Sequence, residues 1–377
     1  MAGLEEKLCP VCFQEAMEHG ECRNCGYHAE ESSAVKDYLA PFTILKEKYL
    51  LGKSLGQGGF GITYLAENMQ SGLRCCIKEY FPSGLLQGRT PDGALILADE
   101  ENRPEYEEGK QQFIEEACAL QELRENISVV DILDFFEENG TAYFAMELIE
   151  GCNLRVFRKN HNPKQTLKMA LQMLFLLGSS LAEVHRFGMI HGDISPENIL
   201  ITQDGEIKLI DFGAARSFRQ GSDNKERKIY LKPNYAPYEQ YTQKPCQGPW
   251  TDIYALAATF YFIVSGRKML DALSRAKGAS YPPLHELCPA VSRQLSDVID
   301  KALAFDYHDR YRRMLDFLDA LEQVVRPEDY DIDLGALMPK SKASKQAEIH
   351  VETSDDSEKM CQVEEQNMPE PKRLAAF

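Results

Sequence analysis

The chain has 377 residues, of which 44% are apolar and 27% are charged, so it is neither wholly disordered nor collagen-like. Its 59 acidic residues outnumber the 42 basic ones, and no basic stripe points to a nucleic acid or an anionic membrane as partner. The longest apolar runs are far too short for a membrane span, and the N-terminus lacks a signal-peptide pattern. We therefore expect a cytoplasmic protein.

Four of the eleven cysteines form two Cys-x-x-Cys pairs near the N-terminus: Cys9, Cys12, Cys22 and Cys25. Each pair forms a tight turn that directs two thiolates at one point, and two such turns complete a tetrahedral zinc site. The segment is too short to build its own core, so we expect a structural Zn²⁺ to supply its folding free energy. A redox dithiol pair is the alternative, and two nearby histidines are alternative ligands.

Composition divides the chain into four regions. We expect a zinc ribbon over residues 1–30, a connector over 31–48, a continuously patterned domain over 49–326 and an acidic, disordered tail over 327–377. The connector predicts a ribbon that is separate from the patterned domain. The ribbon and the tail are candidate segments for recruiting partner proteins, and the sequence leaves the oligomeric state open.

The patterned domain begins with strands and continues mainly with helices. Alternating apolar residues and turn signals predict strands over 49–56, 60–67, 74–80, 127–136 and 141–149. Helical spacing predicts helices over 111–124, 166–187, 252–265, 292–305 and 313–325. Between Lys78 and the first helix we expect a surface loop with its own hairpin, including the acidic run 99–108. A docking or regulatory insert is the alternative.

A glycine-rich stretch lies between the first two predicted strands and consists of Gly56, Gln57, Gly58, Gly59, Phe60 and Gly61. Glycines at such a turn let backbone N–H groups approach phosphates closely, and Lys78 on the next strand is placed to neutralise phosphate oxygens. Asp193 and Asn198 follow in His-Gly-Asp-Ile-Ser-Pro-Glu-Asn, and Asp211 opens Asp-Phe-Gly. These oxygen ligands and this cation are what phosphoryl transfer requires.

These motifs, in this order from Leu55 to about Leu321, resemble those of eukaryotic-type (Hanks-type) protein kinases. The residues within the motifs resemble those of the bacterial serine/threonine branch of that family. The resemblance implies an α+β, two-lobed protein-kinase fold, here preceded by the zinc ribbon. It implies a signalling enzyme that transfers the γ-phosphoryl group of ATP to protein substrates, with Mg²⁺ (or Mn²⁺) held by Asn198 and Asp211. A pseudokinase scaffold and a small-molecule phosphotransferase are the alternatives.

The resemblance also implies the roles of single residues. Lys78 pairs with Glu116 on the first helix, for which Glu115 is the neighbouring competitor. Asp193 is the catalytic base, and Asp252 supports the loop that carries it.

The same resemblance implies where the nucleotide binds. The backbones of Glu147 and Ile149 bond adenine, and Cys76 and Leu200 contribute to the adenine pocket.

Departures from the family pattern occur in and after the catalytic loop. Gly192 replaces the usual arginine that receives an activation-loop phosphate, and residues 212–238 contain no threonine, so we expect activity without loop phosphorylation. Ser195 stands where the family has a phosphate-contacting lysine, and Lys232 stands where it has a threonine. We therefore expect Lys232 to reach over Ser195 and supply the missing cation; a merely solvated Lys232 is the alternative. The family resemblance also implies a buried pair of Glu239 with Arg310.

Overall fold

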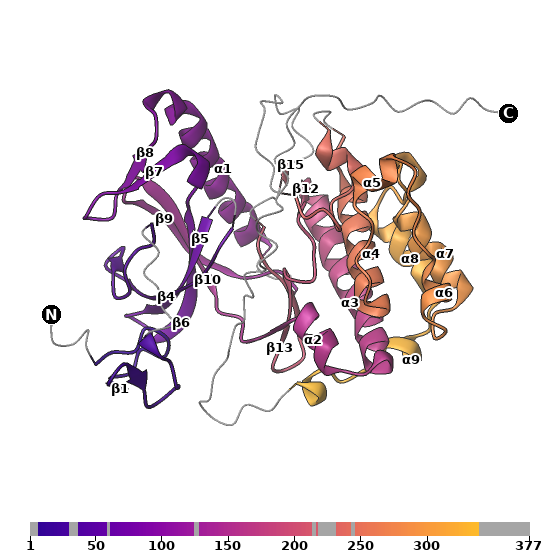
Figure 1. Ribbon diagram of the computed structural model, residues 1–377, viewed down its shortest axis with the longest axis horizontal. Coiled ribbons are helices and arrows are strands. Elements are labelled where there is room, and N and C mark those ends of the chain that lie inside the picture. The colour runs from indigo at the N-terminus through magenta and orange to yellow at the C-terminus, as the bar shows by residue number, and fades with distance from the viewer. Residues whose placement is uncertain are drawn as a thin grey trace. The chain divides into compact units, whose positions relative to one another are not determined.

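Two structural units make up the described part of the chain, which covers residues 7–29, 37–58, 61–123, 128–212, 216–217, 231–242 and 246–338 of the computed structural model. Among these residues, unit 1 takes those within 7–160, 197–212 and 332–338, and unit 2 takes those within 161–196 and 216–331. The α+β class is confirmed, because unit 1 is rich in strands and unit 2 is largely helical (Figure 1).

Unit 1 is built on a six-stranded antiparallel sheet with the order β3-β4-β5-β6-β10-β9. Its strands are β3 (Ile44–Leu45), β4 (Tyr49–Gln57), β5 (Gly61–Asn68), β6 (Leu73–Tyr80), β9 (Ile132–Glu138) and β10 (Thr141–Glu147). Alternate residues such as Leu51, Ile62 and Ile77 point into a buried apolar core. The predicted strands and the predicted hairpin are confirmed to within a few residues, except at 127–136, whose strand starts at Ile132.

The first helix, α1 (Arg103–Glu122), packs against β9 and β10. It starts well before residue 111, so part of the acidic run 99–108 is helix and the loop prediction there was wrong. A proline in the first helical turn and acidic side chains near the positive N-terminal end suit this start. The expected hairpin is confirmed as β7 (Leu86–Arg89) and β8 (Leu95–Leu97), between the short helices η2 (Ser83–Leu85) and η3 (Glu100–Asn102).

A buried ionic cluster holds this hairpin on the sheet. The Glu79 side chain, which is 0% exposed, pairs with Arg89 of β7 and accepts hydrogen bonds of 2.9 Å from the hydroxyls of Tyr64 and Tyr143. Arg89 Nε also donates to the carbonyl of Asp37 at 2.6 Å. The insert and the end of the connector are therefore structural parts of unit 1.

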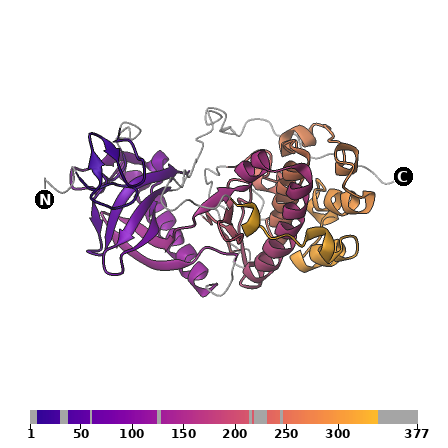
Figure 2. The same cartoon turned by 90° about the horizontal axis from the view of Figure 1, so that it is seen from below.

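The ribbon segment packs against β4 (Figure 2), contrary to the prediction that the connector keeps it apart. The amide of Lys53 donates to the carbonyl of Pro10 at 2.9 Å. A Cβ on Gly52 would lie only 2.2 Å from that carbonyl oxygen, so glycine is what allows the close approach. The ribbon's own strands are β1 (Met17–Glu18) and β2 (Glu21–Cys22). The connector also adds β3 to the sheet.

A second, three-stranded sheet completes unit 1, in the order β11-β13-β14. Its strands are β11 (Gly151–Asn153), β13 (Ile199–Thr202) and β14 (Ile207–Leu209), and the nearby helices are α2 (Leu154–Asn160) and η6 (Gly335–Leu337). The amide of Leu209 donates to the carbonyl of Ser128 at 2.8 Å, which ties β14 to the chain that leads into β9.

Unit 2 is arranged around two long helices, α3 (Pro163–Arg186) and α4 (Pro249–Ser265), which pack together. Almost every residue of α4 is buried. The other elements are β12 (Met189–Ile190), β15 (Arg216–Ser217), η4 (Tyr238–Tyr241), α5 (Ala272–Ala276), α6 (Leu284–Leu287), α7 (Arg293–Ala302), η5 (Tyr307–Asp309), α8 (Met314–Glu322) and α9 (Pro327–Tyr330). The four predicted helices of this region are confirmed as α3, α4, α7 and α8. Among the described helices, α3 alone is long and apolar enough to span a membrane, but it is mostly buried, as a core helix is.

The substitution Arg89→Met should lower the free energy of unfolding by about 3–5 kcal/mol, because it leaves the buried Glu79 without its cation. Urea unfolding followed by circular dichroism measures the change. Arg103→Met is the matched control, since it removes an exposed pair with Glu100 that water screens and that contributes little to stability. Equal losses in the two variants would contradict a structural role for the buried cluster.

Candidate nucleotide and catalytic site

The glycine-rich stretch joins β4 to β5. Its described residues are Gly56, Gln57, Gly58 and Gly61, whereas Gly59 and Phe60 lie outside the described part of the chain. The amide of Gly58 donates to the carbonyl of Gly61 at 2.8 Å. A Cβ on Gly61 would lie 2.3 Å from the carbonyl oxygen of Glu79, so only glycine fits where the loop enters β5.

Lys78 lies at the centre of the sheet of unit 1. It is opposite Thr63 of β5 and Phe144 of β10, and its side chain is only 9% exposed. Its Nζ is 2.7 Å from Oδ1 of Asp211 and lies 5.5 Å from the centre of the Phe144 ring. The structure thus brings together the predicted phosphate-neutralising cation and a predicted Mg²⁺ ligand.

Asp211 directly follows the hairpin of β13 and β14 and has a left-handed backbone, with φ at 63°. A non-glycine residue in this conformation is uncommon, and such strain is concentrated at functional sites. The amide of the preceding Ile210 donates to the carbonyl of Asn198 at 2.9 Å, which holds the chain at Asp211 beside Asn198. The two oxygen donors of the predicted Mg²⁺ site therefore come from the ends of one hairpin, and their chemistry fits that ion.

Glu116, on α1, does not take the place that was expected for it. Its Oε1 is buried and has no hydrogen-bond partner within the described residues, while Lys78 pairs with Asp211. Burial raises the pKa of Glu116 to about 8; the ammonium of Lys78 lowers it, and the carboxylate of Asp211 raises it further. Two carboxylates thus compete for one ammonium. The competitor Glu115 is exposed and accepts a hydrogen bond from Gln111, so Glu116 is the inward-facing residue.

The predicted adenine-binding residues lie at the end of β10 and on neighbouring strands. The backbone amide of Glu147 donates to the backbone carbonyl of Asp131 at 3.0 Å. Of the two backbone groups of Glu147, only the carbonyl therefore remains a candidate for a hydrogen bond with adenine. Its side chain accepts from Lys208 at 2.9 Å, an ion pair that sequence reasoning missed because the two residues are far apart in the chain. Ile149 follows, buried. Cys76 is buried in β6, and Leu200 is half-buried in β13.

In unit 2, the catalytic loop follows β12 and is organised by the buried Asp252 of α4. Its carboxylate accepts hydrogen bonds of 2.8–2.9 Å from His185 Nε2 and from the amides of His191 and Gly192. Burial raises the pKa of Asp252, but the hydrogen bond and charge of His185, together with His191 and the amide of Gly192, bring it below the ordinary value. The expected supporting role of Asp252 is confirmed. Gln240 also donates to the carbonyl of Gly192, a contact that the motif alone does not reveal.

Asp193 and Ser195 of this loop both contact Lys232. Nζ of Lys232 lies 3.0 Å from Oδ2 of Asp193 and donates to Oγ of Ser195 at 2.9 Å. Residues 218–230 lie outside the described part of the chain, so activity without loop phosphorylation stays a prediction.

The predicted pair of Glu239 and Arg310 is confirmed in unit 2. Two parallel hydrogen bonds of 2.7 and 3.0 Å join the guanidinium to the carboxylate, and both side chains are buried. The hydroxyl of Thr251 also donates to Glu239. This pair anchors the start of η4 to α4 and to the chain after α7.

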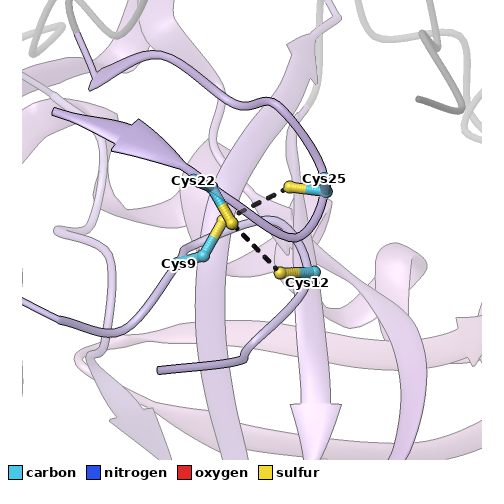
Figure 3. Close-up of side chains that lie close together, drawn as sticks. All are labelled: Cys9, Cys12, Cys22 and Cys25. Carbon is cyan, nitrogen blue, oxygen red and sulfur yellow. Dashed lines mark hydrogen bonds between the residues drawn. The ribbon is translucent and has the colours of Figure 1, made fainter. Parts of the chain in front are cut away.

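The four cysteines of the ribbon converge on one point (Figure 3). Cys9 and Cys25 have their sulfurs 3.6 Å apart, as do Cys12 and Cys22. A tetrahedral zinc with bonds of about 2.3 Å requires sulfurs about 3.8 Å apart, so the donor set fits this ion. Four protein ligands leave no open position, as in a structural site.

Comparison with known proteins identifies the class. The family described as "Protein kinase domain" matches residues 49–319, and the chain belongs to this family. It is 31% identical over 286 residues to serine/threonine-protein kinase F of Synechocystis, an alignment that covers 71% of this chain and 53% of that one. Serine/threonine-protein kinase PknA of Nostoc is 29% identical, with 74% and 48% covered. The chain thus spans about half the length of these relatives.

A solved structure described as "PpkA-294 apo form" is also similar. It is 34% identical with a TM-score of 0.64, and the match covers 76% of this chain and 100% of that one. The kinase family and the serine/threonine-kinase relatives agree with the residues found within each unit by itself, which are Lys78, Asn198 and Asp211 in unit 1 and Asp193 in unit 2.

Purified protein should contain one zinc ion per chain, measured by inductively coupled plasma mass spectrometry, because the four sulfurs match a zinc tetrahedron. Cys22→Ser should lose most of the metal. Cys288→Ser, which changes a cysteine outside the cluster, is the control and should keep it. Wild-type protein without zinc or iron would contradict a metal site.

Glu116→Gln should become more stable relative to wild type as the pH rises from about 5 to 8. In this window the folded wild type holds a proton on Glu116, with a pKa of about 8, that the unfolded chain has released, so wild-type stability falls. Glutamine does not titrate. Thermal unfolding at several pH values measures the difference, and the exposed Glu115→Gln is the control. A pH-independent difference for Glu116→Gln would show that this carboxyl is not desolvated.

Proposed function

We propose that the chain is an ATP- and Mg²⁺-dependent protein kinase that phosphorylates serine or threonine hydroxyls of protein substrates. The observation that carries the proposal is the grouping in unit 1 of Lys78, the strained Asp211 and Asn198 behind a glycine turn. Their charges and oxygen donors are those that a triphosphate and its metal require. The family membership and the serine/threonine-kinase relatives support it.

In this proposal, unit 1 holds the nucleotide. The glycine turn approaches the phosphates, Lys78 neutralises their oxygens, and Asn198 and Asp211 hold Mg²⁺, which when bound offsets the charge of the triphosphate. With Mg²⁺ on Asp211, the ammonium of Lys78 would be free to pair with the phosphates and with Glu116. The buried and unsatisfied Oε1 of Glu116 supports this exchange of partners.

Unit 2 directs the attacking group. The substrate hydroxyl attacks the γ-phosphorus, its proton passes to the carboxylate of Asp193, and the bond from the γ-phosphorus to the oxygen of ADP breaks. Asp252 fixes the loop that carries Asp193 through the amides of His191 and Gly192. These contacts give Asp193 a defined position on the loop.

We further propose that the ribbon holds a structural Zn²⁺, that the kinase domain covers residues 49–326, and that the enzyme acts in the cytoplasm of a bacterial cell. The convergent cysteine sulfurs support the zinc, and the family match over residues 49–319 supports the boundaries. The bacterial serine/threonine kinases among the relatives support a bacterial cell.

Radiolabelled ATP with Mg²⁺ and a generic protein substrate should give labelled protein, and Asp211→Asn should reduce the rate at least about 10²-fold by removing a metal ligand. Asp204→Asn, an exposed change in the same hairpin, is the control and should keep the wild-type rate. Binding of ATP without any transfer would favour a pseudokinase. Transfer to small molecules but not to protein would favour a small-molecule phosphotransferase.

A further inference from the structure

Lys232 is held at the catalytic loop by two contacts of its ammonium group. Nζ lies 2.9 Å from Oγ of Ser195, which is fully buried, and 3.0 Å from Oδ2 of Asp193. Its backbone is fixed as well, because its carbonyl accepts hydrogen bonds of 2.9 Å from the amides of Tyr235 and Ala236. Both ends of this flexible side chain are therefore fixed.

The chemistry of an ammonium group shows what this placement allows. Nζ carries three N–H donors, and the two contacts that the structure shows use two of them. The Lys232 side chain is 34% exposed, so it is not enclosed by the described residues. A phosphate oxygen is a good acceptor for an ammonium, which acts on phosphate as a point charge.

On the basis of the proposed function, we infer that Lys232 is the cation that contacts the γ-phosphoryl group during its transfer. Asp193 accepts the proton of the attacking hydroxyl at about 2.6–3.2 Å, so the γ-phosphoryl group approaches this carboxylate closely. An ammonium 3.0 Å from the same carboxylate is within reach of the phosphate oxygens. Ser195 takes the place of a loop cation and serves instead as the acceptor that positions Lys232.

This role predicts a loss confined to the transfer step. A cation that acts on developing charge contributes on the order of 10²-fold to the rate, so Lys232→Ala should lower kcat by about that factor. The Kd of a fluorescent ATP analogue should change less than about twofold, because unit 1 holds the nucleotide in our proposal. Ser195→Ala keeps the ammonium, loses only its acceptor, and should cost less than about 10-fold. Lys277→Ala changes an exposed lysine of unit 2 and is the control.

A transposed variant separates the charge from a mere tether between the loop and the segment that follows it. Ser195→Lys combined with Lys232→Thr returns an ammonium to the loop and should recover at least about 10-fold of the loss in kcat. If Lys232 were only a tether, the double variant would stay as slow as Lys232→Ala. Thermal unfolding checks that each variant is folded, and Lys232→Gln replaces Lys232→Ala if the latter is not.

The outcomes distinguish this inference from the function on which it rests. An active wild type together with a Lys232→Ala variant that keeps kcat within about threefold would overturn the inference alone. A loss that appears in the Kd for nucleotide, with kcat unchanged, would also overturn it. A folded wild type that binds ATP but transfers no phosphate would overturn the proposed function, and the inference with it.

Discussion

Unit 1 places two carboxylates, Glu116 and Asp211, around the single ammonium of Lys78. Asp211 has the direct ion pair with this ammonium, at 2.7 Å. The other is left with an unsatisfied oxygen and a pKa of about 8. Lys78 comes from β6, Asp211 from the end of the β13–β14 hairpin and Glu116 from the inner face of α1. A metal on Asp211 would leave Glu116 as the carboxylate that pairs with Lys78.

Unit 2 uses a buried carboxylate differently. Asp252 has His185 and two loop amides as partners, and its pKa lies below the ordinary value, so it stays charged. Gly192 takes a left-handed backbone in this loop, with φ at 75°, which suits glycine. Asp252 thus holds the backbone of the loop, and Lys232 contacts two of its side chains. Unit 1 thus contains an ion pair that can change partners, Lys78 with Asp211, and unit 2 contains a catalytic loop that Asp252 holds by hydrogen bonds.

Sequence patterns predicted most helices and strands because these depend on the local periodicity of apolar residues. They predicted the motifs because glycines, a lysine and carboxylates at these spacings have few other uses. They predicted that Lys232 would reach Ser195, since an exchange of residue types is visible in the sequence. They could not decide which carboxylate holds Lys78, because that depends on distances between α1 and the β13–β14 hairpin. They also missed the packing of the ribbon on β4, for which the only signal was a single glycine, Gly52, inside a strand.

The central claim is that Lys78 exchanges Asp211 for a phosphate and Glu116 when nucleotide and Mg²⁺ bind. A crystal structure of the full chain with Mg²⁺ and a non-hydrolysable ATP analogue tests this most directly. The account predicts that Asp211 contacts the metal and that Lys78 Nζ lies within about 3.5 Å of both a phosphate oxygen and Glu116. Bound nucleotide and metal with the Lys78–Asp211 pair still at hydrogen-bond distance, and Glu116 still without a partner, would contradict it.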